Sequence, residues 1–303
     1  MDRKTHMDAF GATALVLFAA NLGFNQVVIK VTNGGFQPVF SAGLRSAGAI
    51  VILLLWMKLR GTTFRIDRAA VPAGLLSGVF FAVEFMALFT ALDLTTVGRA
   101  SVMLYSMPVW LALASHLVIP GERLTKLRTL GMALAMGGVA LALLDRSSAG
   151  ASLAGDLLAL VAAFCWTGIA LCVKITPLSR VAPVHQLMYQ LVVSAPVLLL
   201  AALFFGDLVR DIGPVHLAGL AYQIVCVASL GFLAWFWLLS IYPAASVASF
   251  SFLSPVFAVL LGWALLGEEI APRVWIALGL VAAGIFLVNR RPRAVRATGA
   301  PAR

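Results

Sequence analysis

Ten long apolar segments dominate this sequence of 303 residues. A helix needs about 20 mostly apolar residues to cross the hydrocarbon core of a bilayer, and each segment is close to that length. The segments cover residues 9–30, 38–59, 70–92, 96–119, 127–144, 153–174, 184–205, 216–240, 244–266 and 273–289. The connections between them are too short to hold a soluble domain. The sequence therefore predicts an all-α, polytopic membrane protein with ten transmembrane helices.

The composition argues against other fold classes. The chain is 62% hydrophobic and 11% charged, while soluble domains are about 25% charged. So few charges could not cover the surface of a soluble fold of this size. Disorder requires the opposite composition. Transmembrane barrels use alternating strands of about ten residues, and the segments here are too long and too continuous for that pattern.

The distribution of basic residues predicts the topology. The chain has 22 Lys and Arg and a net charge of +10. With the N-terminus in the cytoplasm, 16 of them fall on the inner side, five fall outside and Arg45 lies within a span. This split follows the positive-inside rule. It predicts a multi-pass protein of the inner (plasma) membrane with both termini in the cytoplasm. Nucleic-acid binding is not expected, because no basic stripe is interleaved with exposed aromatic residues.

The two halves of the chain resemble each other. An offset of 147 positions pairs, without a gap, Phe89 with Phe236, Pro108 with Pro255, Leu113 with Leu260, Glu122 with Glu269, Ala135 with Ala282 and Gly137 with Gly284. Near the start an offset of 144 pairs Lys30 with Lys174. We assign residues 1–146 to a first repeat, residues 147–289 to a second repeat and residues 290–303 to a basic cytoplasmic tail.

Each repeat contains five spans. Because five is odd, the second repeat must cross the membrane in the opposite direction, so the sequence predicts two inverted five-helix repeats. Inverted repeats are typical of secondary transporters, whose substrate site lies near the membrane midplane between the repeats. Two similar halves of opposite orientation can pack in two ways of similar energy, one open to each side of the membrane.

Several stretches resemble a known family. The first half contains ASVMLYSMPVWLALASHLVIPGERLT followed by GMALAMGGVAL, and the second contains ASFSFLSPVFAVLLGWALLGEEIAP followed by GLVAAGIFLV. Both resemble the repeat unit of EamA-type transporters of the drug/metabolite transporter superfamily. The stretch GDLLALVAAFCWTGIALCVK resembles the start of that family's second half. The resemblance implies ten helices, a central cavity, an arginine at Arg45, and export or exchange of small organic metabolites. Some members import instead.

Other chemistry has little support in the sequence. No Gly-Lys dipeptide and therefore no Walker A motif occurs, which excludes ATP-driven transport by this chain alone. The four histidines and three cysteines are scattered without the spacing of metal ligands. We therefore expect no metal, no cofactor and no enzymatic activity. The expected partners are a small-molecule substrate, the lipid bilayer and a coupling proton.

Ionisable side chains within the spans are the strongest candidates for function, because they are costly in a bilayer. Arg45 and Glu84 lie about 10 and about 12 Å below the outer ends of their spans, at 1.5 Å per residue. Asn21, Tyr105 and Gln223 fall in the same layer. One interpretation is a structural layer in which Arg45 and Glu84 pair and hold helices together. The other is a substrate site, with Glu84 facing an amino group or a coupling proton.

The repeat offsets extend this layer toward the inner side. There Arg45 corresponds to Gln190 and Tyr105 to Phe252, so the inner half of the cavity should be less polar. Trp166 follows the counterpart of Asn21, which makes it a candidate for the cavity wall. The predicted substrate-binding residues are Asn21, Asn25, Arg45, Glu84, Tyr105, Trp166, Gln190, Gln223 and Phe252.

A cavity that is polar at one end and aromatic at the other suits an amphipathic solute, such as an amino acid with a large side chain. We therefore predict a secondary transporter of a small organic metabolite, an exporter or exchanger that works by alternating access. Pro108 and Pro255 each remove a hydrogen bond within a span and are candidate hinges. The alternatives are an importer of a vitamin-like aromatic metabolite and an integral membrane protein without transport activity.

Overall fold

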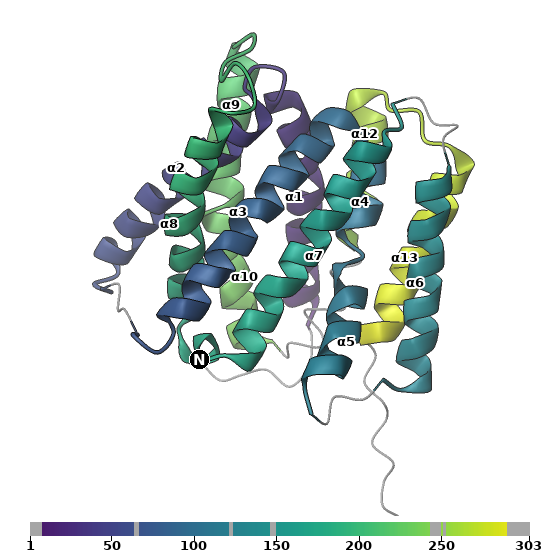
Figure 1. Ribbon diagram of the computed structural model, residues 1–303, viewed down its shortest axis with the longest axis horizontal. Helices are drawn as coiled ribbons and strands as arrows, with labels where there is room; N and C mark the ends of the chain where they lie inside the picture. Colours follow the sequence, from purple (N-terminus) through teal and green to yellow (C-terminus); the bar gives the residue numbers. More distant parts are fainter. Residues whose placement is uncertain are drawn as a thin grey trace, which may run out of the picture.

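The computed structural model describes residues 8–63, 67–120, 124–145, 150–242, 250 and 253–289, and nearly all of them are helical (Figure 1). The elements, in chain order, are α1 (Ala9–Thr32), α2 (Pro38–Leu59), α3 (Val71–Leu94), α4 (Val97–Leu104), α5 (Met107–Val118), α6 (Lys126–Leu144), α7 (Leu153–Ile175), the 3-10 helix η1 (Pro177–Arg180), α8 (Pro183–Ala202), α9 (Pro214–Tyr222), the π-helical segment η2 (Gln223–Val227), α10 (Leu230–Ile241), α12 (Leu253–Leu266) and α13 (Pro272–Asn289).

These elements agree with the ten predicted spans. Eight helical stretches are long and apolar enough to cross a membrane, and α12 and α13 are shorter apolar helices. The fourth span consists of α4 and α5, and the eighth consists of α9, η2 and α10. Of the predicted ninth span, only residue 250 and residues from 253 onward are described. Large apolar side chains such as Leu54, Leu117 and Leu200 are exposed on the helix surfaces, where a bilayer would cover them.

The fourth span is broken in its middle. Helix α4 ends at Leu104 and α5 begins at Met107, with Pro108 in the first turn of α5. A proline there has no N–H to donate to the preceding turn, and the Ser106 hydroxyl donates to the carbonyl of Met103. In the second repeat Pro255 also lies in the first turn of its helix, α12. The break in the first repeat coincides with one of the two proposed hinges.

The fifth and tenth spans, α6 and α13, cross in opposite directions. A Cβ atom on Gly131 would lie 2.8 Å from the carbonyl oxygen of Gly284, and one on Gly138 would lie 2.7 Å from that of Ala277. Contacts that advance along α6 therefore move back along α13. The glycines allow the two backbones to approach this closely. The repeat counterparts run antiparallel, as inverted repeats require.

The second and seventh spans, α2 and α8, make the same kind of pair. The amide of Gln37 donates to the carbonyl of Ala202, and the hydroxyl of Ser194 lies 3.2 Å from that of Ser46. These contacts again run in opposite directions along the two helices. Helix α3 packs against both α7 and α8, and α1 packs against α12 and the eighth span. Helices from both repeats thus enclose the centre of the molecule.

Candidate functional site

A cavity of about 560 Å³ occupies the centre of the bundle and is lined by both repeats. At one extreme it reaches Lys174, near the end of α7, and Pro183, the first residue of α8. We call this end of the bundle, where α1 begins and α13 finishes, the cavity end. At its other extreme the cavity stops near Gln26 and Leu88. The opposite end, where α1 finishes and α4 begins, we call the sealed end.

Arg45 from α2 lies in the deep part of the cavity and is 4% exposed. Its Cζ lies 4.1 Å from the centroid of the Phe85 ring and 5.8 Å from that of Phe89. Within the part of the chain that the structure describes, its guanidinium makes no hydrogen bond and no ion pair, and its Nε is buried without an acceptor. The site thus contains a buried cation that lacks a carboxylate partner.

Glu84 from α3 lines the same part of the cavity and is 6% exposed. Its charge interacts with that of Arg45, but the two side chains do not approach within the 4 Å of an ion pair. Among the described residues nothing donates a hydrogen bond to its carboxylate. Of the two interpretations left open by the sequence, the structure does not contain the direct Arg45–Glu84 pair that a purely structural layer would require.

Polar side chains surround these two charges. The Tyr105 hydroxyl, at the break in the fourth span, lies beside Gln26 and Ser254. The Ser101 hydroxyl donates to Oε1 of Gln26 at 2.8 Å. Gln190 from α8 lines the cavity and donates to Ser77 at 3.1 Å. Asn25 also lines it, with its Oδ1 buried and without a donor among the described residues.

Aromatic rings form much of the remaining wall. Trp166 lines the cavity and meets Tyr105 edge-on, with ring centroids 6.1 Å apart. Phe18 and Trp235 stack on each other at 5.0 Å and line the side toward the cavity end. Arg45 and Glu84 therefore lie in the deep part of the cavity with large apolar surfaces next to them, and the basic side chains Arg128 and Lys174 line the cavity end. This arrangement suits an amphipathic solute.

Asn21 and Gln223 do not line this cavity. The Tyr222 hydroxyl donates to Oδ1 of Asn21 at 2.5 Å, and the Gln223 amide donates to the Thr32 hydroxyl at 3.0 Å. Both residues bond to neighbouring helices, because counting residues along a span predicts the depth of a side chain and not its direction. Phe252 lies outside the described residues.

The cavity residues that were not predicted from the sequence include Gln26, Phe85, Phe18 and Trp235. Gln26 is adjacent to Asn25 in an apolar span, and that polar pair was a usable signal. The aromatic residues gave no such signal, since most aromatic residues in apolar helices face lipid or the packed interior of the bundle. Pro108 lines the cavity beside Tyr105, whereas Pro255 does not belong to its described lining.

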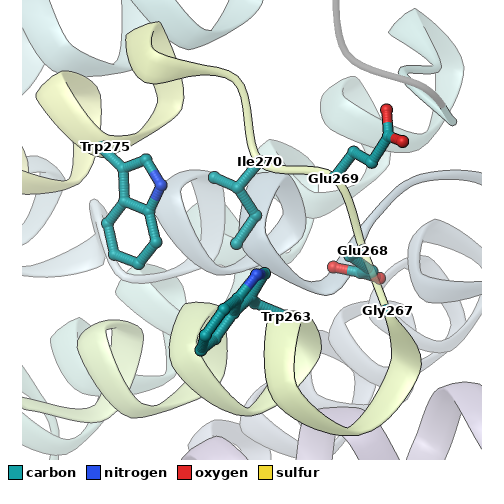
Figure 2. Close-up of a pocket in the computed structure, with 6 residues that line it drawn as sticks. All are labelled: Trp263, Gly267, Glu268, Glu269, Ile270 and Trp275. Atoms are coloured by element: carbon teal, nitrogen blue, oxygen red, sulfur yellow. The ribbon is translucent and has the colours of Figure 1, made fainter.

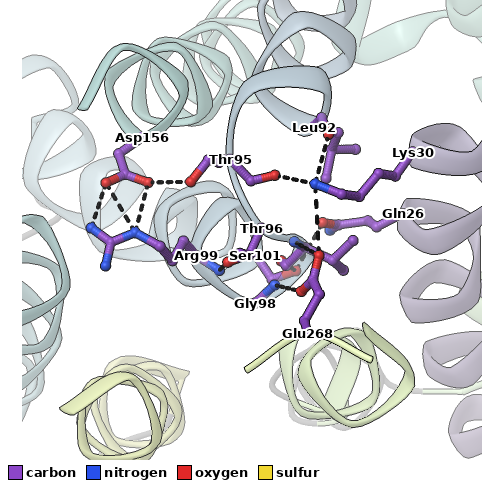
Figure 3. A network of polar contacts seen from close by, with 11 residues as sticks. Gln26, Lys30, Leu92, Thr95, Thr96, Gly98, Arg99, Ser101, Asp156 and Glu268 are labelled. Atoms are coloured by element: carbon purple, nitrogen blue, oxygen red, sulfur yellow. Dashed lines mark hydrogen bonds and ion pairs between the residues drawn. The ribbon is translucent and has the colours of Figure 1, made fainter. Parts of the chain in front are cut away.

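The sealed end is closed by a polar network between the repeats (Figure 3). Lys30 from α1 donates to the carbonyl of Leu92, in the last turn of α3, and to that of Thr95, between α3 and α4. Its Nζ lies 3.7 Å from Oε1 of Glu268. Glu268, from the loop after α12, accepts hydrogen bonds from the backbone N–H groups of Val97 and Gly98 at the start of α4. A carboxylate is favourable at a helix N-terminus.

A second charged pair in Figure 3 is completely buried. Arg99 and Asp156 are both 0% exposed, and their closest atoms are 2.6 Å apart. Arg99 also donates to the carbonyl of Ala142, and Asp156 accepts from the Thr95 hydroxyl. Asp156 lies in the first turn of α7. Outside the spans, the hydrogen bond from Arg210 to Asp93 closes the same end and raises the pKa of Arg210.

A further pocket lies at the sealed end between α12 and α13 (Figure 2). Trp263 and Trp275 flank it, and both are partly exposed at helix ends, where tryptophan commonly anchors a span to the membrane interface. Glu268 is committed to the start of α4, and the side chain of Glu269 points away from the two rings in Figure 2. The pocket has none of the unpaired buried charges of the central cavity.

Comparison with known proteins now decides the family. The EamA-like transporter family matches residues 9–144 and, separately, residues 153–290. The chain belongs to the EamA-like transporter family. Its two matches coincide with the two repeats seen in the helix packing. As an EamA-like protein it is a multi-pass membrane protein, and no group of three potential metal-ligating side chains occurs among its described residues.

Three curated relatives cover nearly the whole chain. The "Probable amino-acid metabolite efflux pump" of Salmonella typhimurium is 32% identical, over 92% of this chain and 94% of that protein. The "Uncharacterized transporter YoaV" of Bacillus subtilis is 24% identical, over 88% and 91%. The "Uncharacterized inner membrane transporter YedA" of Escherichia coli is 26% identical, over 92% and 90%. All three are named as transporters or pumps.

A solved crystal structure has the same fold. It superposes with a TM-score of 0.64 at 22% sequence identity, over 92% of this chain and 95% of that chain. At this identity the likeness concerns the arrangement of helices alone.

Proposed function

We propose that this protein is a secondary transporter that exports amino acids with large side chains across the inner membrane by alternating access. The observation that carries the proposal is that Arg45 and Glu84, which have opposite charges, lie in one buried cavity without forming an ion pair. Arg45 offers a cation and Glu84 an anion, and neither is neutralised by the other at contact distance.

Burial of an unpaired charge is costly unless a partner reaches it. An amino acid carries a carboxylate and an ammonium group on one carbon atom. It can complete both charges at once, with its carboxylate on Arg45 and its ammonium on Glu84. Its side chain then lies against the aromatic wall that includes Trp166, Phe18 and Trp235. The relative named as a probable amino-acid metabolite efflux pump supports the same substrate class and direction.

The conformation corresponds to an inward-facing state under the predicted topology. The positive-inside rule assigns the cavity end to the cytoplasm, because α1 begins and α13 finishes there. Substrate enters from that side and meets Arg45 and Glu84. Export then requires the sealed end to open, which breaks the contacts of Lys30 and Glu268, and the cavity end to close. Lys174 is the repeat counterpart of Lys30 and lines the cavity end.

Glu84 also provides a place for a coupling proton. Its repeat counterpart is Gly231, so the cavity contains this carboxylate in one repeat only. A proton and a substrate ammonium group compete for the same oxygens. Proton entry from outside would release the amino acid, and substrate binding from the cytoplasm would release the proton, so the two move in opposite directions.

Inside-out membrane vesicles test this function. Saturable uptake of radiolabelled leucine, phenylalanine or tryptophan is expected, and an uncoupler should abolish its accumulation. Glu84→Gln and Arg45→Met should reduce uptake at least tenfold while the purified proteins remain monodisperse in detergent. Glu269→Gln is the matched control, because this carboxylate lies in an exposed loop away from the central cavity.

Three outcomes would contradict the proposal. Full uptake by Glu84→Gln would remove this carboxylate from the mechanism. Accumulation only in right-side-out vesicles would indicate an importer. Absence of saturable flux for every amino acid, with a folded protein, would reject the substrate class.

A further inference from the structure

Among the described residues, no anion is in contact with the guanidinium of Arg45. A buried guanidinium is usually paired with a carboxylate or with several carbonyl groups, and Arg45 has neither among the described residues. What lies against it is the face of Phe85, 4.1 Å from Cζ to the ring centroid, with Phe89 at 5.8 Å. A cation within about 6 Å of an aromatic centroid is attracted by the negative face of the ring.

The Phe85 ring is itself held in place. Phe81, Phe85 and Phe89 are spaced four residues apart on α3, so they lie above one another on one face of the helix. Phe81 meets Phe85 at 4.5 Å and 61°, and Phe89 meets it at 6.0 Å and 75°. Phe85 is 7% exposed. Its two neighbours contact it edge-on, which fixes the plane that it presents to Arg45.

We propose that Phe85 is a positioning residue that takes the place of a counter-ion for Arg45. A carboxylate at the same position would neutralise the guanidinium and would occupy its hydrogen-bond donors. A ring face stabilises the positive charge and accepts none of the in-plane N–H donors. Arg45 therefore stays charged and keeps donors for a carboxylate that arrives in the cavity. Glu84, the residue before Phe85, remains separate for the ammonium group.

This inference rests on the proposed function for its substrate and sharpens the requirement for a carboxylate. Phe85 acts on the binding of the acid group and not on that of the amine. Loss of the ring face should weaken binding of an amino acid, and it should leave binding of the corresponding decarboxylated amine unchanged. A residue that only fills space would affect both solutes alike.

Transport measurements with matched solutes test the inference. In Phe85→Leu, the concentration of phenylalanine at half-maximal uptake should rise about 2- to 30-fold, the range given by a cation–π contact, with little change in maximal rate. Inhibition by phenethylamine should be unchanged. Phe85→Tyr retains a ring face and should behave as wild type. Phe24→Leu is the matched control, because Phe24 packs on Tyr222 and does not belong to the described lining of the cavity. An equal effect on both solutes, or none on phenylalanine, would overturn the inference.

A double-mutant cycle gives a readout that needs no substrate. Phe85→Leu should lower the thermal unfolding temperature in detergent more when Arg45 is present than in an Arg45→Met background. The same cycle with Phe24→Leu, at a ring remote from Arg45, should give additive effects. Additivity for Phe85 as well would overturn the inference even if transport were normal. A clear coupling in a protein that transports no amino acid would retain the positioning role and reject the proposed substrate.

Discussion

Arg45 and Arg99 are both buried, 4% and 0% exposed, but their charges are balanced in different ways. Arg99 is bonded to Asp156 through Nε and a terminal nitrogen, and to the carbonyl of Ala142. Arg45 contacts a phenylalanine ring and the cavity. Arg99 therefore has a carboxylate partner within the folded chain, although its second terminal nitrogen lacks an acceptor among the described residues, whereas Arg45 has no carboxylate in contact with it.

The partners of a buried charge distinguish a structural role from a functional one more clearly than its degree of burial does. A paired buried charge fixes the helices that contribute its partners, here α4, α6 and α7. An unpaired buried charge beside a cavity reduces stability, and it is retained only where it contributes to function. Substitution of Arg99 should therefore reduce stability more than substitution of Arg45. Substitution of Arg45 should reduce the transport activity of the folded protein more than substitution of Arg99.

The largest expected effect is on folding. Arg99→Ala should destabilise the protein by about 3–5 kcal/mol, because it leaves the Asp156 carboxylate buried without its cation. Arg45→Ala should cost about 1 kcal/mol or less, since the desolvation penalty disappears with the charge. Thermal unfolding in detergent, followed by size-exclusion fluorescence, measures both variants.

A compensated variant checks the cause. Arg99→Met combined with Asp156→Leu removes both charges and should recover most of the stability that Arg99→Ala loses, because buried ion pairs can be replaced by apolar side chains. If the double variant is as unstable as Arg99→Ala, packing and not charge accounts for the role of Arg99. Equal losses for Arg99→Ala and Arg45→Ala would remove the contrast between the two arginines.

An intermediate effect is expected at Lys30 and Glu268, a pair that is partly exposed and joins the two repeats. Lys30→Met or Glu268→Gln should weaken the sealed end and shift the protein toward the outward-open state. Leu88→Cys, placed in the deep cavity of a variant whose three native cysteines are replaced, reports this opening. A membrane-impermeant maleimide added to intact cells should label it several-fold faster.

Arg273→Gln is the control for this measurement. Arg273 lies 3.9 Å from Asp145 at the same end of the bundle and does not contact the start of α4. Its loss should leave the rate of labelling unchanged. Faster labelling in all three variants would indicate general loosening, and no change in Lys30→Met and Glu268→Gln would mean that this pair does not keep the cavity closed.

The smallest expected effect comes from a comparison of two buried carboxylates, those of Glu84 and Asp156. Glu84→Gln should raise the unfolding temperature by about 2–4 °C, equivalent to about 1 kcal/mol, because an amide is less costly to bury than an unbonded carboxylate. Asp156→Asn should lower it, since Arg99 loses its partner. A lower unfolding temperature for Glu84→Gln would show that the charge of Glu84 is structural.

The sequence predicted the spans well because lipid imposes a length and a composition on every helix that crosses it. Arg45 and Glu84 stood out for the same reason, as charges within apolar runs. Arg99 and Asp156 did not, since each lies at the end of a span, where charged residues are common. Their burial depends on how α4 and α7 pack, which no single segment reveals.

The sequence also did not predict which way a side chain faces around its helix. The amides of Asn21 and Gln223 bond to neighbouring helices and do not face the cavity. The π-helical segment Gln223–Val227 was also not predicted, because nothing in its residues distinguishes it from an ordinary apolar helix. Nothing in the sequence distinguishes Phe85 from the other phenylalanines of α3, and only the folded structure places its ring nearest to Arg45 of α2.

The antiparallel crossing of α6 and α13 has an energetic consequence. A chain whose halves were identical would be degenerate about this crossing, with equal free energies for the inward- and outward-open arrangements. The bias between them must therefore come from positions where the halves differ, such as Glu84 against Gly231 and Ser115 against Gly262. Each such mismatch changes the free-energy difference between the two conformations. Substitutions at these positions can therefore change the resting state without altering the fold.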